Sequence, residues 1–195
     1  MKQIPRWALA SSAAAPLLLG GGLAVAQLLQ PSGYDPVRDT ISALAAHEAT
    51  DRWVMTSALA GLGVCHVITA AGLRPARGAG RVVLACGGVA TVMVAVFPQP
   101  AHGNSVAHTI AATVAFIALG AWPPFSARGH SRTPLLRRSS TITASVGMLG
   151  LVAWFAIEVH GGQRGLSERA AAGAQALWPL AVVVTTRRFA GRTRS

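Results

Sequence analysis

The sequence is poor in acidic residues, lysine and cysteine, and each shortage narrows the range of possible functions. Only six of the 195 residues are Asp or Glu, against 17 Lys and Arg, and the single lysine is Lys2. The two cysteines, Cys65 and Cys86, both lie in apolar stretches, so a disulfide framework is not expected. We interpret both as small apolar packing residues.

The common catalytic motifs are missing as well. The sequence contains no glycine-rich nucleotide loop, no His-Glu-x-x-His, no Gly-x-Ser-x-Gly and no Cys-x-x-Cys. Its apolar stretches lack the carboxylates and arginines that an ion-coupled carrier is expected to place near the membrane midplane. These absences favour a non-catalytic protein over an enzyme, and we predict no cofactor.

Apolar residues dominate the chain: they make up 52% of it, and the mean hydropathy is +0.46. Six apolar stretches are each long enough to cross a bilayer core of ~30 Å at ~1.5 Å per residue. They lie near 7–29, 53–73, 82–97, 106–125, 141–158 and 171–186. We therefore predict an all-α polytopic membrane protein, a six-helix transmembrane bundle that forms a single transmembrane domain over residues 1–195.

Charged residues alternate between the two sides of such a bundle. All six acidic residues fall on one side, and thirteen basic residues fall on the side of the two termini. This basic set is Lys2, Arg6, Arg74, Arg77, Arg81, Arg128, Arg132, Arg137, Arg138, Arg187, Arg188, Arg192 and Arg194. The positive-inside rule then predicts a multi-pass protein of the cytoplasmic membrane with both termini in the cytoplasm.

The net charge of +11 does not indicate nucleic-acid binding, because the arginines lie at the ends of apolar stretches. We expect them to contact anionic lipid headgroups instead. The amino terminus imitates a signal peptide, with Ala24-Val25-Ala26 before Gln27 as a cleavage site. However, the apolar stretch 7–29 is long for a signal sequence, which favours an uncleaved first helix. Cleavage would leave five spans with the same orientation.

The longest connection on the acidic side, about 30–52, has its own pattern. Asp35-Pro36 is typical of a helix N-cap followed by proline at the first helical position. Val37, Ile41 and Leu44 then repeat at helical spacing. The pattern predicts a short amphipathic outer helix near 36–46, which lies in the headgroup layer or caps the bundle.

Several of these runs resemble a known family. They are residues 34–42 (YDPVRDTIS), 53–56 (WVMT) and 63–66 (GVCH), followed by Phe97-Pro98, His102-Gly103, His108 and Trp122-Pro123. Together they are similar to the membrane family catalogued as domain of unknown function 998. The resemblance implies six helices and an uncleaved first span. It implies no activity, so no residue takes a role from it.

Polar residues gather on the acidic side and form a candidate site. They are Asp35, Arg38, Asp39, Asp51, His102, His108, Glu158 and His160. Ser105 or Asn104 is expected to cap the fourth span, which places His108 in its first turn. Glu158 ends the fifth span, where the helix dipole disfavours its charge, so we expect it to pair with His160, Arg164 or Arg169. The alternative is that all of these are solvated or ion-paired loop residues.

A metal-dependent hydrolase or transferase is a second possibility, since zinc needs three nitrogen or oxygen ligands and a spare carboxylate. His102 and His108 are its candidate ligands, although their spacing matches no recognised metal motif. This hypothesis requires at least three of the acidic-side His, Asp and Glu side chains to converge.

Two polar residues lie inside apolar stretches, His66 and Gln175. Ionisable groups in a membrane usually face the bundle interior, so a small transporter that uses His66 is a further alternative. A neutral histidine that hydrogen-bonds to a hydroxyl or carbonyl group of a neighbouring helix is the simpler interpretation.

The sequence therefore favours a non-catalytic integral membrane protein. Its extracytoplasmic polar face would bind a lipid headgroup, a small molecule or a partner membrane protein. This hypothesis predicts a groove or apolar patch beneath the first outer helix, whereas the transporter hypothesis predicts a polar cavity that reaches His66.

Overall fold

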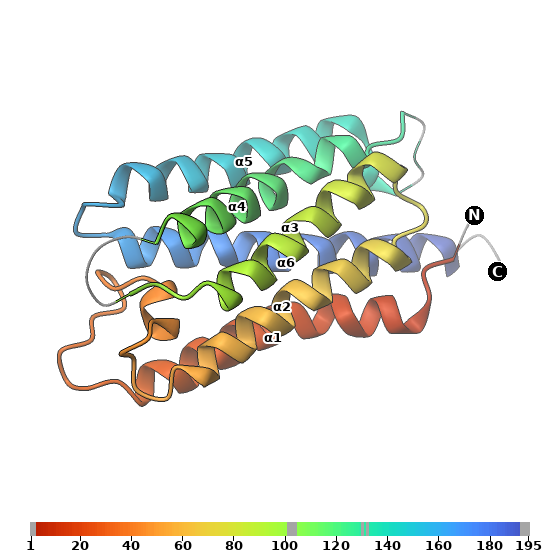
Figure 1. The fold of residues 1–195 in the computed structure, drawn as a ribbon. Helices are drawn as coiled ribbons and strands as arrows, with labels where there is room; N and C mark the ends of the chain where they lie inside the picture. The colour runs from red at the N-terminus through yellow and green to blue at the C-terminus, as the bar shows by residue number, and fades with distance from the viewer. Residues whose placement is uncertain (1–2, 101–104, 130, 132, 192–195) are drawn as a thin grey trace.

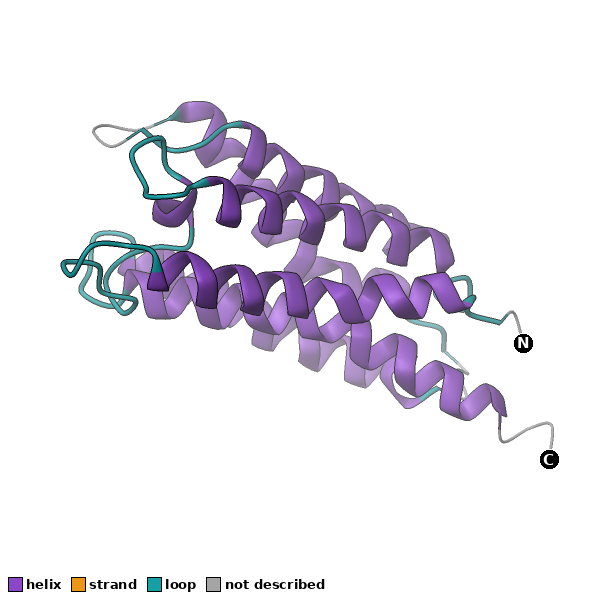
Figure 2. Cartoon of the chain, turned by 90° about the horizontal axis from the view of Figure 1, so that it is seen from below, coloured by secondary structure: helices purple, strands orange, loops and turns teal. Residues whose placement is uncertain are grey.

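The computed structural model describes residues 3–100, 105–129, 131 and 133–191 of the chain. Within these residues it contains six α-helices, two short 3-10 helices and no strand (Figures 1 and 2). The elements are α1 (Arg6–Leu28), η1 (Ser42–Ala45), α2 (Trp53–Gly72), α3 (Gly78–Val96), α4 (Val106–Ser126), η2 (Pro134–Leu136), α5 (Arg138–Glu158) and α6 (Arg164–Gly191).

The predicted six-helix bundle is confirmed. The first five helices begin and end within four residues of the predicted stretches, and α1 to α5 are each long and apolar enough to cross a membrane. The sixth helix differs more. It begins at Arg164 instead of near residue 171, because its first two turns carry charged residues that a hydropathy pattern excludes.

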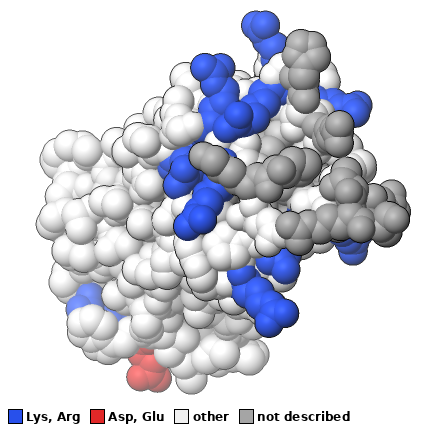
Figure 3. Space-filling model, turned by 90° about the vertical axis from the view of Figure 1, so that its right-hand side faces the viewer, with Lys and Arg blue, Asp and Glu red and all other residues white. Residues whose placement is uncertain are grey.

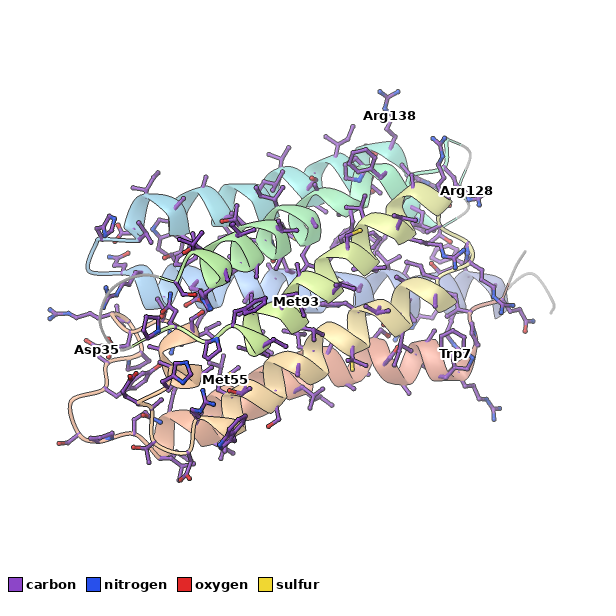
Figure 4. All side chains as sticks on the ribbon, in the orientation of Figure 1. Trp7, Asp35, Met55, Met93, Arg128 and Arg138 are labelled. Atoms are coloured by element: carbon purple, nitrogen blue, oxygen red, sulfur yellow. The ribbon has the colours of Figure 1, made fainter. Side chains whose placement is uncertain are left out.

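The helices form an antiparallel ring in which each packs against the next in sequence, and α6 closes the ring by packing on α1 (Figure 1). One end of the bundle carries both termini and the arginine-rich connections; we call it the arginine end (Figure 3). The opposite end carries all six acidic residues, and we call it the acidic end. Figure 4 labels Asp35 at the acidic end and Arg128 and Arg138 at the other.

Large apolar side chains cover the outside of the bundle. Leu17 in α1 is 73% exposed and Val146 in α5 is 67% exposed, although both lie well inside their helices. A water-soluble protein rarely exposes extensive apolar surface, whereas lipid tails solvate such side chains favourably. The surface and the helix lengths together describe an integral membrane bundle.

Glycine brings α2 and α3 into close contact. A Cβ atom on Gly63 would lie 2.5 Å from the carbonyl oxygen of Gly88, and a Cβ on Gly88 would lie 2.6 Å from that of Gly63. No side chain fits at these distances. Small residues at such crossings let helix backbones approach closely, which is how membrane helices gain packing energy.

Arginines at the arginine end bond to backbone carbonyl groups. Arg81 Nε donates to the carbonyl of Ala70 at 2.7 Å, near the end of α2, and Arg128 Nε donates to that of Pro75 at 2.6 Å. Because the last carbonyls of a helix have no partner within it, these guanidinium groups stabilise the helix end and the turn that follows.

The predicted outer helix near 36–46 is present only as the four-residue helix η1, Ser42–Ala45. Before it the chain makes turns: Asp35 Oδ1 accepts from the N–H of Val37 at 2.9 Å, and Asp39 Oδ2 accepts from the N–H of Asp35 at 2.9 Å. These side chains satisfy the backbone locally, so no continuous helix forms. We call residues 34–46 the capping segment.

Two apolar clusters fill the interior. The first lies near the acidic end, where Leu44 of the capping segment packs with Met55 and Leu59 of α2; Figure 4 labels Met55 and Met93 beneath this segment. The second lies toward the arginine end and includes Leu73, Leu84, Trp122, Val182 and Val183. Cys65 belongs to the first cluster, as predicted, whereas Cys86 is exposed on α3.

Candidate functional site

The capping segment is attached to the start of α6. The carbonyl oxygen of Val37 accepts hydrogen bonds from the N–H groups of Gly165 at 2.9 Å and Leu166 at 3.0 Å. The first N–H groups of a helix have no acceptor within the helix, and the carbonyl oxygen of Val37 serves as the acceptor for two of them. A Cβ on Gly165 would clash with the carbonyl oxygen of Asp39, so only glycine permits this approach.

Two arginines of α6 strengthen the attachment. Arg164 Nε donates to the carbonyl of Arg38 at 2.7 Å, and its Nη2 lies 3.8 Å from Asp39 Oδ1. Arg169 Nη1 donates to the carbonyl of Asp39 at 2.7 Å, and its Nη2 donates to the Tyr34 hydroxyl. Burial raises the pKa of Tyr34 above its ordinary value, although Arg169 acts in the opposite direction, so the phenol stays neutral.

Glu168, between these arginines and one turn into α6, points inward and is only 4% exposed. Its Oε2 accepts from the N–H of Ile41 at 2.6 Å, and the Ser42 hydroxyl lies 3.4 Å from Oε1. The structure shows two ion pairs among its described residues, Asp35–Arg38 and Asp39–Arg164, and neither includes Glu168. A buried carboxylate therefore lies directly beneath the capping segment.

His108 joins the same group of polar residues. Ser105 caps α4 as predicted, since its hydroxyl accepts from the N–H of His108 at 3.3 Å. His108 Nδ1 lies 2.8 Å from the carbonyl of Phe97, and Nε2 lies 3.1 Å from the Ser42 hydroxyl. Because a carbonyl can only accept, Nδ1 carries a proton. Ser42 thus lies between Glu168 and His108.

A cavity of about 50 Å³ opens below this cluster, in the middle of the bundle. Its wall is mostly apolar and comes from α1, α2, α3, α4, α6 and the capping segment. The polar residues that line it are Ser42, His66, Thr91, Glu168 and Gln175. The outer helix is not present as predicted, so a groove or apolar patch beneath it stays a prediction; the structure has this cavity beneath Ile41 and Ser42 instead.

His66 lines the cavity from α2 and is 1% exposed. Neither of its ring nitrogens has a hydrogen-bond partner among the residues that the structure describes. The simpler interpretation, in which His66 hydrogen-bonds to a neighbouring helix, is therefore wrong within the described part of the chain. Gln175, in contrast, donates from Nε2 to the carbonyl of Phe116 at 2.8 Å. An unpaired buried polar group costs about 1–3 kcal/mol of stability. A hydrogen-bonding group inside the cavity would remove this cost at His66.

The predicted polar site on the acidic side does not assemble around one point. Asp35 and Arg38 pair with each other, and Asp39 holds the capping segment to α6. Asp51 and His160 are exposed. Glu158 does not pair with a cation as expected; its Oε2 accepts from the N–H of Gln163 at 3.0 Å. His102 lies outside the described residues.

The zinc hypothesis finds no ligand set in the described part of the chain. No three His, Cys, Asp or Glu residues there are close enough to hold a metal ion. His108 is engaged with Phe97 and Ser42 instead. Because His102 is not described, a site that includes it stays a prediction.

Sequence reasoning missed Glu168, because it precedes the predicted sixth stretch, 171–186, and so falls in a connection on the acidic side. One signal pointed to it: Glu168 and Gln175 are seven residues apart, which places them on the same face of a helix, about 10 Å apart along the axis. Ser42, Tyr34 and Arg169 had no such signal, because their partners are distant in sequence.

Comparison with known proteins identifies the family of the chain. Neither the curated proteins nor the solved structures include a significant match to the chain. A family model described as "Protein of unknown function (DUF998)" matches residues 12–185, which is most of the sequence and includes all the residues that line the cavity. The chain therefore belongs to the DUF998 family of proteins of unknown function.

Proposed function

We propose that this integral membrane protein lies in the cytoplasmic membrane and binds a small ligand from the extracytoplasmic side. In this proposal α6 is the sixth crossing, the arginine end faces the cytoplasm, and the acidic end faces outward. The distribution of arginines supports this orientation, since cytoplasmic connections of membrane proteins are enriched in Lys and Arg.

One observation carries the binding proposal: the buried carboxylate of Glu168 lines a cavity beneath the capping segment. A buried charge is costly unless it is paired, and such groups inside membrane bundles usually mark sites for ions, protons or ligands. A lipid headgroup or a free small molecule that enters the cavity past the capping segment would meet Glu168 directly beneath it.

Two features favour this ligand over the alternatives. Of the charged residues predicted for the outer face, Asp35, Arg38 and Asp39 are engaged within the chain, as is Arg164, so a partner protein would find these four already paired. A transporter would need a path to the arginine end. The second apolar cluster lies on that path, and its Leu73, Leu84 and Trp122 are fully buried.

The test is mass spectrometry of the molecules that co-purify with the protein in detergent, compared between the wild type and an Ala172→Leu variant. Ala172 lines the cavity, so leucine fills part of it. The matched control is Ala153→Leu, an exposed position on α5. We expect a bound species in the wild type and the control that is lost from Ala172→Leu. Identical species and amounts in all three proteins would contradict the proposal.

A further inference from the structure

The cavity wall has an acidic group but no basic one among its described residues, and this determines which ligands can bind there. Its polar groups are one carboxylate, one imidazole, two hydroxyls and one amide, whereas no Lys or Arg is among the residues described along the wall. Arg169 follows Glu168 in sequence and its charge acts on the carboxylate, but its guanidinium group bonds to Tyr34 and Asp39 in the capping segment.

Glu168 has unused capacity to accept hydrogen bonds. An ionised carboxylate offers about four acceptor positions, and three contacts use them: the Ile41 N–H at 2.6 Å, the Ser42 hydroxyl at 3.4 Å and the Ser42 backbone N–H. A cationic donor inside the cavity would use the remaining position. It would also neutralise a charge that the apolar wall cannot solvate.

The size of the cavity sets the size of the ligand. One water needs roughly 10–15 Å³ by this measure, so about 50 Å³ holds a group of only a few heavy atoms. Apolar side chains such as Leu59, Leu62 and Phe116 surround that space. A short alkyl chain fits such a wall, whereas a hydrated metal ion would leave its water shell against hydrocarbon.

His66 lines the inner part of the cavity, well below Glu168. It lies about 20 Å along α2 from Trp53, whereas Glu168 lies only about 6 Å along α6 from its first residue. A ligand of a few heavy atoms that pairs with Glu168 therefore does not reach His66, whose ring nitrogens have no partner among the described residues.

From these features we propose that the cavity binds a small organic ammonium group, which pairs with Glu168. This inference rests on the proposed ligand-binding function and names its ligand class. A free amino alcohol and the aminoethyl headgroup of a phospholipid share this chemistry.

The test measures the thermal unfolding midpoint of the full chain in detergent by its tryptophan fluorescence. Three compounds of similar size are titrated at matched ionic strength: ethanolamine, ethylene glycol and glycolate. We expect a saturable rise in Tm with ethanolamine alone. The rise should disappear in Glu168→Gln and persist in Glu48→Gln, whose carboxylate is exposed on the same end.

Each other result overturns the inference. An equal ethanolamine shift in Glu168→Gln and the wild type means that the amine binds elsewhere, and no saturable shift means that it does not bind. If Glu168→Gln fails to fold, Ala172→Leu replaces it, because it fills the cavity without removing the charge. A shift retained in Ala172→Leu would again contradict the inference.

Two further comparisons distinguish a lipid headgroup from a free amine, and the ammonium inference from the proposed binding function. Nanodiscs that contain phosphatidylethanolamine are compared with phosphatidylglycerol nanodiscs; a higher Tm in the former, lost in Glu168→Gln, identifies the lipid headgroup as the ligand. If glycolate or ethylene glycol gives the saturable shift and Ala172→Leu abolishes it, the ammonium inference fails and the proposed binding function stands. If co-purifying molecules do not depend on Ala172, both fail.

Discussion

The backbone N–H of Ile41 donates a 2.6 Å hydrogen bond to the carboxylate of Glu168, which lies 127 residues later in the chain. This contact fixes the capping segment over the cavity and orients Glu168 between the segment and the cavity. Because both groups are buried, the bond forms in a low-dielectric environment, where charge-assisted hydrogen bonds are strong. The position of the segment and the chemistry of the cavity therefore depend on each other.

The first prediction concerns Gly165, where the capping segment touches α6. In Gly165→Ala, the new methyl group would lie 2.7 Å from the carbonyl oxygen of Pro36 and would clash with that of Asp39. We expect a loss of about 1–3 kcal/mol of stability and faster proteolysis within residues 30–52. Thermal unfolding and limited proteolysis measure both effects.

The control for this substitution is Gly173→Ala on the same helix. A Cβ at Gly173 meets nothing within 4 Å, so alanine there should be neutral or slightly stabilising. Equal behaviour of the two variants would show that the capping segment is not held against Gly165.

The second prediction concerns Ser42, which lies between Glu168 and His108. Ser42→Ala removes the hydroxyl that His108 Nε2 contacts at 3.1 Å and leaves that nitrogen buried. We expect destabilisation of about 1–3 kcal/mol, measured by thermal unfolding. Ser57→Ala is the control, because the Ser57 hydroxyl is exposed and bonds only within its own helix. A neutral Ser42→Ala would argue against a bonded Ser42–His108 pair.

The third prediction tests the crossing of α2 and α3. Gly63→Ala and Gly88→Ala each place a methyl group within about 2.6 Å of a backbone oxygen on the other helix, and backbone cannot move aside cheaply. Each variant should lose about 1–3 kcal/mol and expose more surface to proteases. Gly147→Ala on α5, where a Cβ has open space, should behave as the wild type. Stable alanine variants at both positions would contradict this packing.

Much of the helical framework could be predicted from the sequence, because long apolar stretches have few alternatives in a membrane. The limits of α1 to α5 followed from where arginines, prolines and polar residues interrupt those stretches. The cap at Ser105 was predictable for a similar reason, since its hydroxyl serves a neighbouring backbone group.

The capping segment could not be predicted in the same way. Its spacing of Val37, Ile41 and Leu44 suggested one helical face, but Val37 is exposed, while Ile41 and Leu44 are buried in the single short turn at η1. The start of α6 takes the carbonyl of Val37 as its partner. Tertiary contacts therefore decide the backbone here, and local periodicity does not reveal them.

Glu168 illustrates the same limit for the candidate site. A charged residue next to an apolar stretch is normally solvated, and the sequence places it beside two arginines. Only the fold shows that the arginines point to the capping segment while Glu168 points into the cavity. The unpaired state of His66 is likewise a property of its neighbours in space.

The last prediction concerns orientation, because entry of a ligand from outside requires the acidic end to face outward. Single cysteines are introduced by Ser32→Cys at the acidic end or Gly129→Cys at the arginine end, both exposed, in a background of Cys65→Ala and Cys86→Ala. Intact cells are then treated with a membrane-impermeant maleimide, before and after permeabilisation.

We expect labelling of Ser32→Cys in intact cells and labelling of Gly129→Cys only after permeabilisation. The reverse pattern would place the capping segment, Glu168 and the cavity on the cytoplasmic side, and it would contradict the proposed extracytoplasmic binding site.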